Sequence, residues 1–118
     1  MSLISTPMLS MVERLLDVAA FRQSLISSNI ANVDTPRYRT RDIDFRSELV
    51  RAQHQTDRES WRPLVRQVSG LMERPDGNNV SLERESLLLA QTQLQFRAGV
   101  RLLRAEFRYL LTAINEGR

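Results

Sequence analysis

Residues 81–116 read SLERESLLLAQTQLQFRAGVRLLRAEFRYLLTAINE, and no other part of the chain constrains its architecture so strongly. Mostly apolar side chains recur in it at alternating intervals of four and three residues, the heptad spacing of a helix that packs along one stripe. The members of this predicted seam are Leu82, Ser86, Leu89, Gln93, Phe96, Val100, Leu103, Phe107, Leu110 and Ile114. Ser81 supplies an N-cap and Gly117 follows the far end. The sequence therefore predicts a helix over about 82–116, roughly 50 Å long at ~1.5 Å per residue.

The N-terminal stretch repeats the same alternation. Its seam positions are Met8, Val12, Leu15, Ala19, Arg22, Ile26, Asn29 and Val33. Pro7 suits a first helical turn, and Pro36 stops the helix. If the two helices pair antiparallel so that Ala19 faces Leu103, then the polar breaks Asn29 and Gln93 fall in one layer. A buried amide pair would fix the register, whereas in the alternative both amides lie at frayed, solvated positions.

These patterns predict an all-α fold, in which two long terminal helices form an antiparallel coiled-coil-like hairpin around a short, partly irregular middle segment. We expect one domain with three parts, an N-terminal helical arm (1–32), a turn and middle segment (33–80), and a C-terminal heptad helix (81–118). In the middle, Asp44 is expected to cap a short helix through Gln53, and residues 64–68 could form a short strand. Little core is expected outside the seam, and many leucines lie off it, which favours assembly over a free monomer.

Composition excludes most enzyme chemistry. The chain has 118 residues, 17 Arg, no Lys and 14 acidic residues, so its formal net charge is only +3. It contains no Cys, and His54 is its single histidine, which excludes disulfides, thiolate zinc sites, a Cys nucleophile and a His-based triad or metal cluster. Asp42 and Asp44 have no His or third clustered carboxylate beside them, and Asp44 has an adequate role as an N-cap. We expect no catalytic residue, metal, cofactor or small-molecule substrate.

The first ten residues carry no basic side chain, and Ser, Thr and Pro interrupt their apolar residues. This does not match a secretory signal peptide, and no segment approaches the ~20 apolar residues that cross a bilayer. Trp61 is the only tryptophan, and either anchoring the loop or contacting a neighbouring subunit would account for it.

Residues 28–45 read SNIANVDTPRYRTRDIDF, and this run closely resembles the N-terminal signature of bacterial flagellar basal-body rod and hook proteins. The signature and assembly residues that the resemblance indicates are Asn29, Ile30, Ala31, Asn32, Asp34, Thr35, Pro36, Tyr38, Arg39, Asp42, Asp44 and Phe45. The family carries glycine where this chain has Arg37, and arginine adopts a positive φ only at a cost that glycine avoids. The segments 41–45 and 76–85, with only a short span between them, resemble the proximal-rod members.

The resemblance implies a non-enzymatic structural subunit of the proximal rod that is exported unfolded by the flagellar type III apparatus, without a cleaved signal peptide. Such a subunit assembles helically in the periplasm-spanning rod of the basal body and transmits torque. The implied partners are further copies of itself, other flagellar rod proteins, the basal adaptor between the rod and the membrane ring, and the export apparatus.

Arg97, Arg101, Arg104 and Arg108 form a stripe on the C-terminal helix, and the alternative function is a cytoplasmic basic helical protein that binds nucleic acid. Nucleic-acid binding would be expected to show a higher net charge and exposed aromatic residues among the basic ones, which disfavours nucleic acid as a partner. In the expected register, Asp17 lies near Arg104 and Arg108, and Glu13 near Arg108. The stripe is therefore interpreted as charges that flank the seam.

Overall fold

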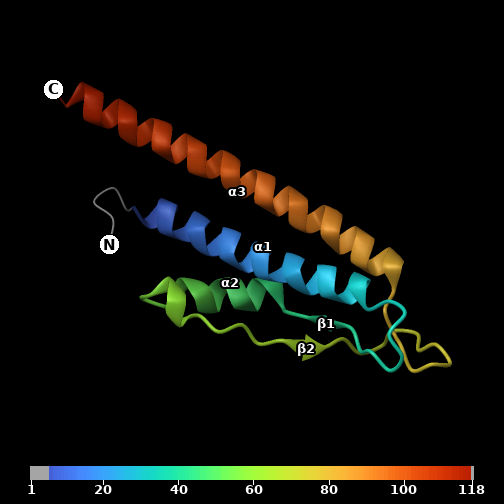
Figure 1. Ribbon diagram of the computed structural model, residues 1–118. Helices are drawn as coiled ribbons and strands as arrows, with labels where there is room; N and C mark the ends of the chain where they lie inside the picture. Colours follow the sequence, from blue (N-terminus) through green and yellow to red (C-terminus); the bar gives the residue numbers. More distant parts are fainter. Residues whose placement is uncertain (1–5, 118) are drawn as a thin grey trace.

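The computed structural model describes residues 6–117, which form an elongated molecule of 69 × 25 × 19 Å (Figure 1). The first five residues of the expected arm 1–32 and the last residue of the expected arm 81–118 lie outside this range. The elements in chain order are α1 (Pro7–Ala31), β1 (Arg41–Asp42), α2 (Phe45–Gln53), the 3-10 helix η1 (Arg58–Ser60), β2 (Arg66–Gln67) and α3 (Leu82–Glu116). No helix in this range is long and apolar enough to cross a membrane.

Each α-helix begins at a side-chain cap. The Thr6 hydroxyl accepts from the Leu9 amide at 3.0 Å and Pro7 occupies the first turn of α1, so the helix starts where its unpaired amides are satisfied. Asp44 caps α2 and Ser81 caps α3 in the same way. The capped helix expected from Asp44 to Gln53 is thereby confirmed.

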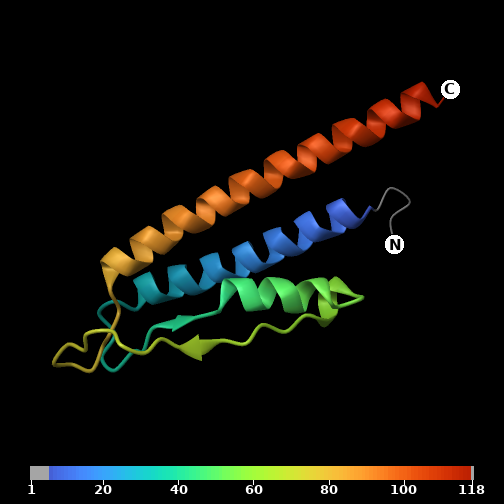
Figure 2. The ribbon, with the colours of Figure 1, turned by 180° about the vertical axis from the view of Figure 1, so that it is seen from behind.

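The helix α1 lies between α3 on one side and α2 on the other (Figures 1 and 2). The mostly helical hairpin of two long terminal helices is confirmed. The expectation of little core outside that hairpin is wrong, because a hydrophobic cluster lies between α1 and the middle segment. Its buried members are Val18, Leu25, Ile43 and Ala52, and Phe21, Phe45, Leu49 and Trp61 pack against them.

Arg14 and Trp61 hold the middle segment against α1. Arg14 donates to the Ala52 and Gln55 carbonyls at 3.0 and 3.1 Å, which satisfies the C-terminal end of α2. The buried carboxylate of Glu48 accepts from the Trp61 indole N–H at 3.0 Å, and the Trp61 ring meets Phe21 edge-on. Trp61 therefore anchors the loop within the chain.

The short strands β1 and β2 pair antiparallel, with Arg41 opposite Gln67 and Asp42 opposite Arg66. The strand predicted over 64–68 forms only at Arg66–Gln67. The remaining backbone between α2 and α3 is irregular, as its prolines suggest.

The expected register of the hairpin is wrong. Asn29 contacts Glu85 (2.9 Å) and Thr6 contacts Glu106 (3.3 Å). Leu16 comes so close to Gly99 that a Cβ added at this glycine would lie 2.8 Å from its Cδ2 atom. These contacts place Ala19 opposite the turn that contains Phe96, not opposite Leu103. The polar residue that pairs with Asn29 is Glu85, which lies eight residues before the expected Gln93, and Gln93 is exposed.

The predicted seam also lies on the wrong line of α3. The side of α3 that meets α1 carries Glu85, Thr92, Gly99 and Glu106, one per heptad. Of the seam residues, Val12, Ala19 and Ile26 are buried; Leu15, Leu89, Phe96, Val100, Leu103 and Leu110 are half-buried; and Met8, Phe107 and Ile114 are 41%, 40% and 51% exposed. The heptad spacing identified an apolar stripe on α3. The two helices instead approach each other closely at Gly99, so the adjacent line of small and polar residues faces α1.

Candidate functional site

The signature segment forms a sharp turn after α1. Asn32 caps the helix and donates from its side chain to the Ser28 carbonyl at 2.8 Å, and Thr35 donates to the Asn32 side chain at 3.0 Å. Pro36 follows and cannot continue the helix. The predicted end of the first arm is therefore where the structure places it, and the chain reverses at this point.

Arg37 has φ = +63°, the left-handed conformation that glycine adopts without steric cost. Its amide donates to the Asp76 carbonyl at 2.9 Å, which ties the turn to the loop before α3. Gly77 in that loop also has a positive φ, and a Cβ at this glycine would lie 3.2 Å from Arg37 Cγ. The positive-φ turn, which the substitution of arginine for the family's glycine made doubtful, therefore forms with arginine in place.

Asn29 is the hub of the site and is 1% exposed. Its amide nitrogen donates to the Arg41 carbonyl and to Glu85 Oε1, both at 2.9 Å. Its oxygen accepts from the Tyr38 hydroxyl at 3.0 Å and from the Arg41 amide at 3.2 Å. Both donors and both lone pairs are used, so this single side chain fixes α1, the turn and α3 relative to one another.

An ionic cluster lies beside this hub. Asp42 accepts a two-point contact from Arg22 at 3.0 and 2.9 Å, and a further bond from Arg84 at 2.7 Å. Arg84 also donates to the buried Glu85 at 2.8 Å. Burial alone would raise the pKa of Asp42, but bonds from Arg22, the Ile43 amide and Arg84 hold that pKa below its ordinary value. Asp42 therefore stays ionised, and the cluster joins α1, β1 and α3.

The loop before α3 completes the site, and the sequence pointed to it only as part of the segment 76–85 that resembles the proximal-rod members. Asn78 donates from its side chain to the Asn32 and Thr35 carbonyls at 2.9 and 2.8 Å. Asn79 accepts from the Thr40 amide at 2.7 Å. Buried amides that satisfy a distant backbone carry no periodicity in the sequence, so only their proximity to a turn could have indicated this role.

The structure gathers part of the predicted signature set and not the rest. Asn29, Asn32, Thr35, Pro36, Tyr38, Arg39 and Asp42 lie at the turn, where Arg39 bonds the Gly77 carbonyl at 3.2 Å. Asp44 and Phe45 serve α2 and its core instead. The side chains of Ala31 and Asp34 are exposed to solvent, and that of Ile30 is half-buried. The described residues hold no group of three His, Cys, Asp or Glu side chains that could bind a metal.

Glu13 and Asp17 pair with Arg58, so the expected pairing with Arg104 and Arg108 is wrong. Arg58 Nε donates to Asp17 at 2.8 Å and Nη1 to Glu13 at 3.1 Å. These bonds follow from the packing of the middle segment on α1, which the two-helix prediction did not include. They leave the arginine stripe of α3 exposed.

Comparisons with known proteins give one consistent result. Residues 16–39 match a family model described as flagella basal body rod protein. The flagellar basal body rod protein FlgB of Salmonella typhimurium is 30% identical over 86% of this chain and 88% of its own length. That of Bacillus subtilis is 30% identical over 91% and 92%, and that of Cereibacter sphaeroides is 35% identical over 79% and 82%. The family match covers the end of α1 and the turn, and the relatives extend the similarity over both arms.

Proposed function

This chain belongs to the FlgB family of flagellar basal body rod proteins, and we propose that it is exported by the flagellar type III apparatus and stacks helically in the proximal rod to transmit torque. Its role is structural and non-enzymatic, and its place is the rod of the flagellar basal body. The proposed partners are further copies of the chain, other rod proteins, the basal adaptor between the rod and the membrane ring, and the export apparatus.

The observation that carries this proposal is the hydrogen-bonded hub at Asn29. A subunit that transmits torque must resist shear between its elements, and a fully satisfied buried amide joins α1, the turn and α3. The neighbouring cluster of Arg22, Asp42 and Arg84 adds charged bonds across the same junction. The signature residues gathered at the turn are proposed to set the angle at which the hairpin enters the rod.

Two further features support export and assembly. The chain has no cysteine, so no disulfide has to be reduced before it passes unfolded through a narrow channel. Large apolar side chains are exposed along α3, among them Leu87, Leu94, Tyr109 and Leu111. Apolar surface of this extent on a helix indicates contact with neighbouring subunits.

The test separates export from assembly in a strain that lacks the gene and is complemented with variants. Asn29→Leu removes the hub and leaves Glu85 with one hydrogen-bond partner fewer, so this variant should abolish rod formation and motility. Its secretion should continue, because the chain passes through the channel unfolded. The matched control is Ser27→Ala, an exposed position on the same helix. Normal rods with Asn29→Leu would refute the role of the hub, and normal rods in the deletion strain itself would refute the function.

A further inference from the structure

Four arginines form a continuous ridge on α3. Arg97, Arg101, Arg104 and Arg108 are all exposed, and in the part of the chain that the structure describes none of them bonds a carboxylate. Each lies two positions from Gly99 or Glu106, which face α1. Two residues are about 200° around a helix with ~3.6 residues per turn, so the ridge faces away from α1.

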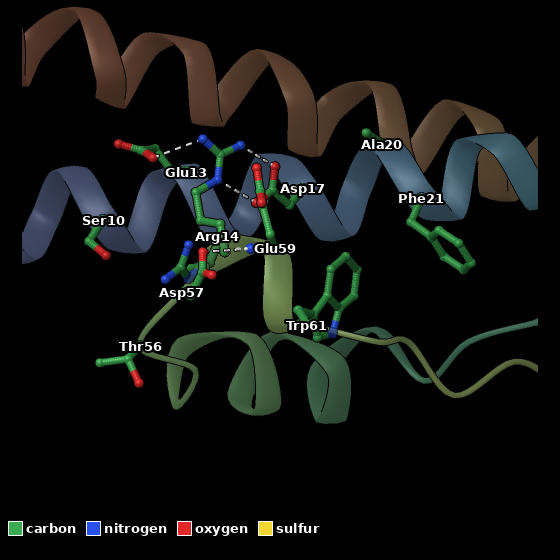
Figure 3. Close-up of a pocket in the computed structure, with 11 residues that line it drawn as sticks. Ser10, Glu13, Arg14, Asp17, Ala20, Phe21, Thr56, Asp57, Glu59 and Trp61 are labelled. Carbon is green, nitrogen blue, oxygen red and sulfur yellow. Dashed lines mark hydrogen bonds and ion pairs between the residues drawn. The ribbon is translucent and has the colours of Figure 1, made fainter. Parts of the chain in front are cut away.

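An acidic groove lies between α1 and the segment 56–61. It has a volume of about 1070 Å³, and its walls carry Glu13, Asp17, Asp57 and Glu59 (Figure 3). Arg58 pairs with Glu13 and Asp17, and among the described residues Arg14 bonds only backbone carbonyls. Within residues 6–117, Asp57 and Glu59 have no cationic partner, so the groove keeps a negative excess.

We propose that the arginine ridge of one copy docks in the acidic groove of the next copy. The inference rests on the proposed function and names the contact by which copies stack. A chain cannot fill its own groove, because no residue of α3 lines it and the ridge faces away from α1. The contact joins two different patches, and such heterologous contacts repeat into an open helical assembly when the rotation does not close.

The charges of the two surfaces are complementary. The ridge from Arg97 to Arg108 is about 16 Å long at ~1.5 Å per residue, so its positive charges lie along one line of the helix. Phe96 and Val100 flank the ridge around a shallow hollow, and Phe21 and Trp61 line the groove, so apolar contact accompanies the ion pairs. Exposed ion pairs are individually weak, and repetition along the ridge together with this apolar contact gives the interface its selectivity.

Crosslinking between single-cysteine chains tests the contact directly, because the chain has no cysteine of its own. Arg104→Cys and Glu59→Cys are expressed as two separate chains in the same cells, and isolated basal bodies are treated with a short bismaleimide. A dimer that contains one of each chain is expected. The matched control replaces Arg104→Cys with Arg46→Cys, an exposed arginine on α2, and should yield no dimer. Absence of the mixed dimer overturns the proposal. Protection of the ridge cysteine from the bismaleimide by another rod protein overturns it as well.

Charge reversal provides the second arm. Arg101→Glu with Arg104→Glu should lower rod yield on the order of tenfold, because attractive pairs become repulsive. Glu59→Arg alone should also lower it, and combining Glu59→Arg with the ridge variant should restore part of the loss. Arg46→Glu is the control. Wild-type rod yield in the ridge variant refutes this contact but leaves the rod function intact, whereas rods in the deletion strain refute the function itself.

Discussion

Arg37 holds a backbone conformation that costs an L-residue with a Cβ roughly 1–2 kcal/mol. Arg37→Gly removes that cost, while glycine adds some entropy to the unfolded chain. We expect the variant to raise the free energy of unfolding by about 1 kcal/mol, measured by urea denaturation. Arg37→Ala keeps the Cβ and should show no such gain. Equal stability of the glycine and alanine variants would contradict the role of backbone strain.

The lowered pKa of Asp42 predicts that the free energy of unfolding depends on pH. Its pKa in the folded chain is lower than the ordinary value of 3.8, because bonds from Arg22, Ile43 and Arg84 outweigh burial. Its contribution is therefore complete above the unfolded-state pKa and is lost as the pH falls through the lower folded value. Asp42→Asn should be less stable than wild type at pH 7, and the difference should shrink below about pH 4. A difference that stays constant from pH 7 to pH 2 would contradict this assignment.

The two long helices can be tested for register. Ala19→Cys with Phe96→Cys should form a disulfide readily under mild oxidation, because Leu16 and Gly99 meet one turn away. Ala19→Cys with Leu103→Cys should not, since Leu103 lies about two turns further along α3. Mobility on non-reducing gels measures the yield. A higher yield for the second pair would restore the register that the heptad pattern alone suggested.

Gly99 sets how closely α1 and α3 approach. Gly99→Val places a branched side chain against Leu16 and should lower the free energy of unfolding by about 2 kcal/mol. Gly99→Ala should stay within about 1 kcal/mol of wild type, because its higher helix propensity offsets a clash that the end of Leu16 can relieve. Thermal denaturation distinguishes the two. A valine variant as stable as the alanine variant would contradict close packing at this position.

Helix positions could be predicted from the sequence, because caps and prolines act locally. Asp44, Ser81 and Pro7 each mark a helix start that the structure confirms. The pairing of α1 with α3 could not be predicted. Two rows of residues along α3 follow heptad spacing, and the more apolar row is not the one that faces α1. The row that does face α1 contains Glu85 and Gly99, which a search for apolar residues passes over.

At the scale of the molecule, α3 continues beyond α1. Thr6 contacts Glu106, so from Phe107 onwards α3 has no described part of α1 beside it (Figure 1). We expect amides of residues 107–116 to exchange quickly in a dilute monomer and slowly in assembled rods. Hydrogen exchange followed by mass spectrometry measures both states. Strong protection of this segment in the monomer would show that its order does not depend on neighbours.

The candidate site could be predicted only in part for a related reason. The signature run pointed to Asn29 and the turn, because those residues are contiguous in the sequence. The partners that complete the site come from elsewhere, with Glu85 on α3 and Asn78 in the loop before it. Hydrogen bonds between segments so far apart follow from the whole fold and leave no local pattern.

The polar line between α1 and α3 has a mechanical consequence. Among residues 6–117, Thr92 Oγ1 and Gln95 Oε1 are buried on this side of α3 without a hydrogen-bond partner, and Gly99 contributes no side chain. Pulling the two helices apart returns these oxygens to water, where they regain hydrogen bonds, and this gain offsets part of the cost of exposing apolar side chains such as Val12 and Leu16. The ionic cluster of Arg22, Asp42 and Arg84 at the turn end of the hairpin resists separation more strongly. The hairpin is therefore held more firmly at its turn than along this polar line.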